Sequence, residues 1–263
     1  PYAVWARDIL KLRVLQRPDE EVEARARATA IHSAFENFVL QHPGPVPADA
    51  AAIFEGLYMR ALEEQGMPHE ALARERALAR EAAEWVAELE RGRRADGRAI
   101  HVEQTGRLTL PLAGGPFEVN AKADRIELDP AGFGHILDYK TGQAPSKKMV
   151  ETGFSPQLTL TAAILAAGGF PNLGRPTPGD LTYLSVTGRR PAGREEIRAA
   201  AGEESIEAAR KALEGLEELV RRFDDPEQPY LSRSAPQFVK MYASDYDHLA
   251  RVGEWAAAEA GEE

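Results

Sequence analysis

The sequence predicts an α/β fold in which a mixed central sheet is flanked by helices and preceded by a helical extension. Residues 1–95 show mainly helical periodicity, whereas residues 98–188 combine strand patterns, a hairpin turn and a helix. Residues 203–223 then return to the spacing of an amphipathic helix. With 263 residues and a hydrophobic content of 43%, the chain is long enough to bury a sizeable core.

The first part is expected to form several helices, because proline and glycine interrupt the helical pattern at residues 42–47 and 66–68. A helix rich in alanine, glutamate and arginine should follow, from about residue 69 to residue 91. These helices are expected to frame a site on the sheet that follows them.

Residues 98–188 are expected to form the sheet. Asp129–Gly132 has the residue order of a type I turn, so the strands before and after it should pair as an antiparallel hairpin. The strands are expected at about 99–112, 117–128, 136–140 and 180–187.

A helix is expected between the hairpin and the last of these strands. Ser155 suits an N-cap, Pro156 suits the first helical position, and Gly168 with Gly169 should end the helix. Near the end of the chain, Ser244 and Asp247 have the spacing of a capping box that opens a final helix.

Carboxylates and an amine gather in the hairpin. Asp138 and Lys140 are two residues apart on a strand and therefore share a face. On the preceding strand, one face is expected to carry Lys122, Asp124, Ile126 and Leu128. If the register brings Asp124 and Asp138 to the same face, their oxygens can bind a hard cation such as Mg²⁺, and Lys140 can orient water or neutralise charge on a phosphate. Asp-x-Lys is also common on solvated strand faces, so this spacing alone is a weak indication.

The order of the polar residues resembles the PD-(D/E)xK nucleases, and within them the RecB-like branch and the carboxy-terminal nuclease domain of the AddB family. The resemblance covers about residues 1–250 and implies a restriction-endonuclease-like core. Its motif residues, in chain order, are His32 on a helix, Glu103 on the first strand, Asp124, Asp138 and Lys140 in the hairpin, and Gln157 on the next helix. Thr161 stands where the family usually has tyrosine.

The resemblance assigns roles to these residues. It implies that His32, Asp124, Asp138 and the backbone carbonyl of Tyr139 bind Mg²⁺, with Mn²⁺ as the alternative metal. It also implies that Lys140 is the catalytic amine, supported by Glu103 and Gln157. Without the resemblance, a single helical histidine such as His32 is more often a core or surface residue than a ligand.

The absence of cysteine excludes disulfides and an iron–sulfur cluster. Many AddB-like nuclease domains carry a four-cysteine cluster that joins the two ends of the domain. We expect aromatic packing to replace it here, through Trp5, Phe238, Tyr242 and Tyr246.

The net charge of −10 disfavours a DNA-binding protein that acts alone. Two groups of basic residues are the exceptions. The first lies around the hairpin and comprises Lys122, Arg125, Lys140, Lys147 and Lys148. The second is expected to be a solvated loop and comprises Arg189, Arg190, Arg194 and Arg198.

We expect one structural domain, with a helical part at 1–95 that carries the histidine, a nuclease core with C-terminal helices at 96–250, and a frayed tail at 251–263. The chain lacks a bilayer-spanning apolar run and a signal sequence, so a cytoplasmic, nucleoid-associated protein without membrane contact is expected. Because the chain starts at Pro1, we expect it to be a fragment of a larger protein.

The resemblance implies a hydrolase that cuts single-stranded DNA during double-strand break repair and recombination, with DNA and an AddA-like helicase–nuclease subunit as partners. Two alternatives stay open. The chain can be a freestanding RecB-like exonuclease, or an inactive nuclease fold that serves as a DNA-binding or scaffolding module.

Overall fold

A computed structural model describes residues 1–13, 22–232 and 245–252. The chain divides into two compact units, one formed by residues 1–20 and 222–263 and the other by residues 21–221. The larger unit carries the sheet and every predicted site residue.

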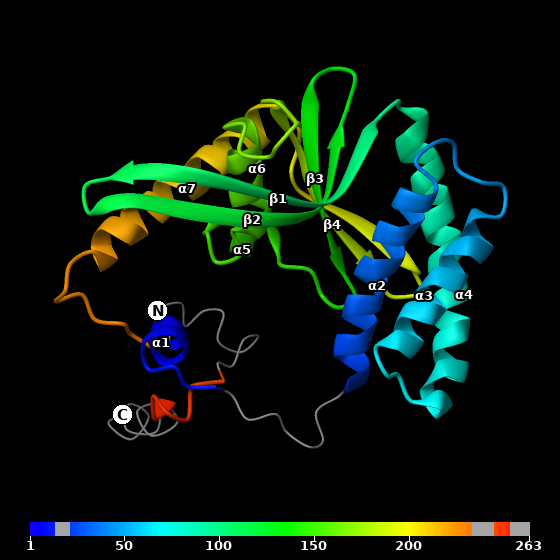
Figure 1. Ribbon diagram of the computed structural model, residues 1–263, viewed down its shortest axis with the longest axis horizontal. Helices are drawn as coiled ribbons and strands as arrows, with labels where there is room; N and C mark the ends of the chain where they lie inside the picture. The colour runs from blue at the N-terminus through cyan, green and yellow to red at the C-terminus, as the bar shows by residue number, and fades with distance from the viewer. Residues whose placement is uncertain (14–21, 233–244, 253–263) are drawn as a thin grey trace, which may run out of the picture. The chain divides into compact units, whose positions relative to one another are not determined.

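The sheet of the larger unit has five strands in the order β1-β2-β3-β4-β5 (Figure 1). The strands are β1 (Ala99–Leu112), β2 (Gly115–Leu128), β3 (Phe133–Lys140), β4 (Thr177–Val186) and β5 (Gly193–Ala199). Neighbouring strands are antiparallel except β3 and β4, which are parallel and joined through two helices. This mixed sheet with helices on both faces confirms the predicted fold class.

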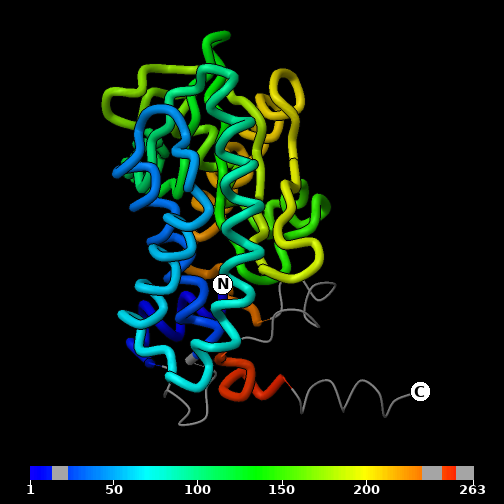
Figure 2. The backbone as a smooth tube through the Cα atoms, turned by 90° about the vertical axis from the view of Figure 1, so that its right-hand side faces the viewer, coloured from blue at the N-terminus to red at the C-terminus, as the bar shows by residue number. Residues whose placement is uncertain are grey.

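One face of the sheet is covered by three helices, namely α2 (Val22–Gln41), α3 (Ala50–Glu64) and α4 (His69–Ala95). Their apolar side chains form a core with the residues of β3 and β4 that point toward them, including Leu137, Tyr139 and Leu184. Phe35 of α2 stacks on Tyr139 with ring centroids 4.0 Å apart. Figure 2 shows α4 running beside the strands β4 and β5. The helical breaks predicted near residues 42–47 and 66–68 are confirmed, because they lie between these helices.

The other face packs against α5 (Lys147–Glu151), α6 (Gln157–Ala166) and α7 (Glu203–Phe223). Ile126, Ile136 and Tyr183 point toward this second core, which also contains Leu158 and Ile164 of α6. The strand residues 136, 137 and 139 thus alternate between the two cores as the period of a strand requires.

A buried ion-pair network fastens α4 to the sheet. The guanidinium of Arg125 on β2 is fully buried and pairs with Glu90 of α4 and, at 2.7 Å, with Glu127. Glu127 also accepts hydrogen bonds from Arg93 (2.7 Å) and Arg98 (2.9 Å). The expectation that Arg125 belongs to a basic group near the DNA is therefore wrong, because solvent and substrate cannot reach its side chain.

Two local expectations need correction. The helix α6 begins at Gln157 with Pro156 at the N-cap, so Ser155 does not cap it. Arg194 and Arg198 lie on the edge strand β5 and not in a solvated loop; the Nε of Arg198 donates to the carbonyl of Pro145 at 2.6 Å. Arg189 and Arg190 are exposed in the turn that precedes β5.

The smaller unit contains α1 (Tyr2–Val4) and a π-helix at Trp5–Ile9. Trp5 contacts Tyr2 with ring centroids 5.4 Å apart, and the hydroxyl of Tyr246 donates to the carbonyl of Leu12 at 3.2 Å. The other two members of the expected aromatic cluster, Phe238 and Tyr242, lie outside the described residues. So do Ser244 of the predicted capping box and residues 253–263 of the predicted tail, so these expectations stay predictions.

No helix in the described part of the chain combines the length and the apolar character needed to span a bilayer.

Candidate active site

Asp138 and Lys140 lie at the end of β3 and point to the same face, as the strand period predicts. The Lys140 ammonium forms an ion pair with Asp138 and lies over the ring of Tyr183, 5.5 Å from its centroid. Asp138 is only 3% exposed, and apart from the ion pair with Lys140 its carboxylate oxygens have no hydrogen-bond partner among the described residues. A buried carboxylate whose oxygens lack donors is costly unless a cation lies beside it.

Asp124 of β2 connects the sheet to α2. Its Oδ2 atom lies 3.0 Å from the Nε2 of His32 and accepts a hydrogen bond of 3.0 Å from the backbone N–H of Tyr139. The Nδ1 of His32 lies 2.7 Å from the carbonyl of Ala28, which fixes Nδ1 as a donor. In neutral His32, Nε2 therefore carries the lone pair, which is the form that binds metals, whereas the contact with Asp124 in the structure requires a proton on Nε2.

The backbone is irregular at Asp124. The β1–β2 register passes from Val102–Arg125 to Gln104–Ala123 and leaves out Glu103 and Asp124. Glu103 has a φ of +53°, which is unfavourable for a side chain other than glycine. The alternation of side chains along β2 changes phase here, since Ala123 and Ile126 both face the α6 side. The prediction that Lys122, Asp124, Ile126 and Leu128 share one face is therefore wrong.

The remaining predicted residues lie around this centre with fewer contacts. Glu103 forms an ion pair with the exposed Lys122. Gln157 is exposed at the start of α6, and the structure gives its side chain no contact with another described site residue. Thr161, one turn later, is buried in α6. The assigned roles of Glu103 and Gln157 stay predictions.

The negative charge of Asp124 affects the pKa values of both Asp138 and His32. Burial, followed by the negative charge of Asp124, raises the pKa of Asp138 to about 6, although Lys140 opposes the shift. For His32, burial acts to lower the pKa, but its hydrogen bond to Asp124 and the charge of that carboxylate outweigh burial and raise the pKa. Asp138 is therefore strained as an anion when no cation binds beside it.

This strain predicts a gain in stability for Asp138→Asn. A carboxyl group whose pKa is raised by folding lowers the free energy of unfolding as pH rises from its unfolded pKa, near 4, to its folded pKa, near 6. Measured by urea unfolding without added metal at neutral pH, the variant should gain about 2 kcal/mol. It should also lack the loss of stability between about pH 4 and 6.

The exposed Asp224→Asn serves as the matched control and should behave like the parent. Lower stability of Asp138→Asn at neutral pH would instead assign Asp138 a structural role.

The donors suit a hard cation. Asp138 and Asp124 offer carboxylate oxygens, His32 offers Nε2, and the backbone carbonyl of Tyr139 belongs to the same segment. The described residues do not gather three or more His, Asp or Glu side chains in a metal-binding cluster. The buried carboxylate of Asp138, whose only ion-pair partner among the described residues is Lys140, nevertheless suits a cation, so this ligand set stays a prediction that the donor chemistry supports.

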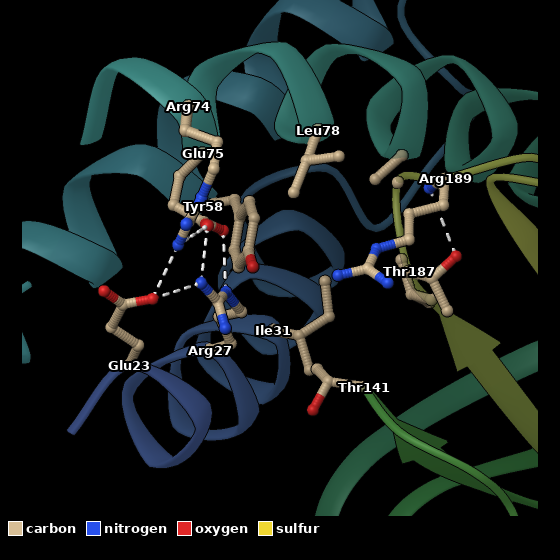
Figure 3. A pocket seen from close by; sticks show the side chains of 13 residues that line it. Glu23, Arg27, Ile31, Tyr58, Arg74, Glu75, Leu78, Thr141, Thr187 and Arg189 are labelled. Atoms are coloured by element: carbon tan, nitrogen blue, oxygen red, sulfur yellow. Dashed lines mark hydrogen bonds and ion pairs between the residues drawn. The ribbon is translucent and has the colours of Figure 1, made fainter. Parts of the chain in front are cut away.

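Arg189 is exposed, as the predicted solvated loop requires, and its guanidinium is directed into a cavity bordered by Ile31 and Thr141 (Figure 3). These two residues are neighbours in sequence of His32 and Lys140. The run of arginines at 189–198 was the only signal of this in the sequence.

Comparison with known proteins identifies the family. A model of the PD-(D/E)XK nuclease superfamily matches residues 1–234. An uncharacterized protein of Rickettsia bellii is 28% identical over 170 residues, which are 65% of this chain and 20% of that protein. An uncharacterized protein of Rickettsia felis is 42% identical over 78 residues, which are 30% of this chain and 9% of that protein. The chain thus spans a fifth or less of the length of these two relatives.

A solved structure titled "Crystal structure of SSO0001" covers 70% of this chain and 84% of its own at 13% identity. Its TM-score of 0.30 is too low to support an argument about the fold.

Proposed function

Because the chain belongs to the PD-(D/E)XK nuclease superfamily, we propose that it is a metal-dependent deoxyribonuclease that hydrolyses phosphodiester bonds of single-stranded DNA. The observation that carries this proposal is the pair formed by Asp138 and Lys140 at the end of β3. The buried carboxylate of Asp138 is close enough to a second carboxylate, Asp124, for their charges to interact, and it forms an ion pair with the ammonium of Lys140.

In this proposal His32, Asp124, Asp138 and the carbonyl of Tyr139 hold Mg²⁺ or Mn²⁺. When bound, the ion supplies Lewis acidity that polarises the phosphate and lowers the pKa of water. The carbonyl of Ala28 orients His32 through Nδ1, and the hydrogen bond from the backbone of Tyr139 fixes the carboxylate of Asp124 against β3.

Lys140 contributes a compact positive charge. The Lys140 side chain is partly exposed and its ammonium lies over the ring of Tyr183, so it can reach a phosphate outside the sheet. We assign it the neutralisation of charge that develops on the scissile phosphate and the orientation of the attacking water. Glu103 and Gln157 are assigned supporting positions at the rim of the site.

We further propose that the chain acts within a larger helicase–nuclease of the AddAB type, with an AddA-like partner, during the processing of double-strand breaks. The lengths of the relatives and the net charge of −10 support a domain that receives its DNA from other parts of an assembly.

Incubation with single-stranded oligonucleotides labelled at the 5′ or the 3′ end tests the nuclease assignment. We expect cleavage in Mg²⁺ or Mn²⁺ and none in EDTA, and the two labels distinguish cutting from an end and cutting inside the strand. If the chain binds the metal and the strand but neither label reports cleavage, it is an inactive nuclease fold and the proposed activity is wrong.

A further inference from the structure

A cavity of about 560 Å³ lies on the face of the sheet that α2, α3 and α4 cover, whereas Lys140 faces Tyr183 on the other side of β3. It lies between the helices α2, α3 and α4 and the ends of β3 and β4 (Figure 3). Ile31 in its wall directly precedes His32, and Thr141 directly follows Lys140. Its volume is within the range of small-molecule sites and is large enough for one nucleotide.

One cation in this cavity is available to a ligand. The guanidinium of Arg189 points into the cavity and forms no hydrogen bond or ion pair with any residue that the structure describes. The other two cations are already neutralised. Arg27 binds Glu75 at 2.7 Å and Arg74 binds Glu23 at 2.6 Å. An unpaired guanidinium directed into a cavity favours a phosphate or carboxylate ligand.

The turn that carries Arg189 is fixed in place. The backbone N–H groups of Thr187 and Gly188 both donate to the carbonyl of Ala192 at 2.9 Å. Gly188 has a φ of +62° and approaches α4 so closely that a Cβ atom would lie 2.2 Å from the carbonyl oxygen of Leu78. The backbone N–H of Arg189 itself donates to the hydroxyl of Thr187 at 3.2 Å. The direction of the Arg189 side chain is thus supported by a rigid backbone.

The lining of the cavity matches both parts of a nucleotide. Apolar atoms come from Ile31, Leu78, Ala82 and Val186, and the ring of Tyr58 lies beside them. Such a wall can pack against a base or a sugar, while Arg189 supplies charge for the phosphate. The hydroxyls of Thr141 and Thr187 add hydrogen-bonding groups.

We propose that this cavity is a subsite for one nucleotide of the strand that is cut, with a backbone phosphate bound by Arg189. The inference rests on the proposed nuclease function, because the strand that the cavity would hold is the substrate of that activity. It gives the chain a local contact with DNA despite its negative net charge.

The test compares Arg189→Gln with Arg190→Gln. Arg190 is exposed in the same turn and does not line the cavity, so it is a matched control for charge. Binding of a fluorescent single-stranded oligonucleotide is measured by anisotropy in EDTA, where cleavage cannot interfere, over a range of salt concentrations. Deoxythymidine monophosphate is titrated in parallel to separate a nucleic-acid strand from a free nucleotide.

We expect Arg189→Gln to weaken oligonucleotide binding about 10-fold and to reduce the slope of log affinity against log salt by about 0.7. Arg190→Gln should stay close to the parent. Equal affinity of both variants and the parent, or no binding by the parent, overturns the subsite. Arg189-dependent binding of the monophosphate without such binding of the strand overturns it as well, because the cavity then serves a free nucleotide.

The two proposals can fail separately. If the parent cleaves DNA in Mg²⁺ but Arg189→Gln binds the strand normally, the subsite is wrong and the nuclease assignment is unaffected. If binding of the strand depends on Arg189 but the parent does not cleave, the subsite is supported and the nuclease activity is wrong.

Discussion

Replacing Lys140 by alanine is expected to reduce DNA cleavage by about 10²- to 10³-fold while leaving metal affinity nearly unchanged. Lys140 is not among the predicted ligands, and its ammonium is the positive group that lies on the same face as Asp138. Its removal takes away charge stabilisation at the phosphate without removing an oxygen donor. Asp138→Ala should instead remove metal binding and cleavage together, because it deletes the carboxylate whose oxygens lack other partners.

The experiment measures cleavage rates of labelled single-stranded DNA and metal affinity by calorimetry for both variants. Lys148→Ala, an exposed lysine on α5, is the matched control and should cleave like the parent. If Lys140→Ala and Asp138→Ala both cleave at the parent rate, the active site lies elsewhere. If Lys140→Ala also loses the metal, the lysine organises the site and does not act on the phosphate.

Replacing Arg125 by methionine is expected to lower the free energy of unfolding by about 3–5 kcal/mol. The substitution keeps most of the buried volume but leaves the carboxylates of Glu90 and Glu127 without their shared cation, and both are fully buried. Arg93 and Arg98 still bind Glu127, so the effect is a large loss and not complete unfolding. Urea unfolding at neutral pH measures it.

The network also predicts acid sensitivity. Burial acts to raise the pKa of Glu127, but Arg125 and Arg93 outweigh it and lower that pKa to about 2. A carboxyl group with a lowered pKa stabilises the fold above its unfolded pKa, near 4.5, and this contribution is lost as pH falls toward 2. Arg125→Met should therefore reduce the stability at neutral pH more than near pH 2.

The exposed Arg210→Ala, which removes ion pairs on α7, is the control and should leave the unfolding midpoint nearly unchanged. A similar, small effect of Arg125→Met would show that the buried network contributes little to stability.

The spacing of apolar residues along the chain and the residues that favour turns were sufficient to predict much of the fold. The strand expected at 99–112 and the helix expected at 203–223 have the bounds that the structure gives to β1 and α7. The hairpin turn was also correct, since the N–H of Gly132 donates to the carbonyl of Asp129 at 3.1 Å. These features depend on neighbouring residues, so the sequence carries them locally.

The predictions were wrong where the structure depends on contacts between segments that are far apart in the sequence. Arg125 looked like a surface cation because its partner Glu90 lies 35 residues away on α4. The strand β5 was missed because its charged residues resemble a loop, although charged side chains are typical of an edge strand. The phase change at Asp124 could not be predicted, because it accompanies the unusual backbone of Glu103 on the neighbouring strand.

In the candidate site, too, the local features were predicted from the strand pattern and the long-range contacts were not. Asp138 and Lys140 share a strand, so their common face follows from the strand period. The approach of His32 to Asp124 joins residues 92 positions apart, and it was expected only from the family resemblance. The cavity of Arg189 combines five segments of the chain and had no counterpart in the sequence analysis.

Titration of Mg²⁺ and Mn²⁺ into the protein and into its Asp124→Ala variant, with cleavage of single-stranded DNA followed in the same samples, tests the central claim most directly. We expect the parent to bind the metal and cleave, and we expect the variant to lose both, because Asp124 is one of the proposed ligands. Metal binding and cleavage by Asp124→Ala at the level of the parent would contradict the account.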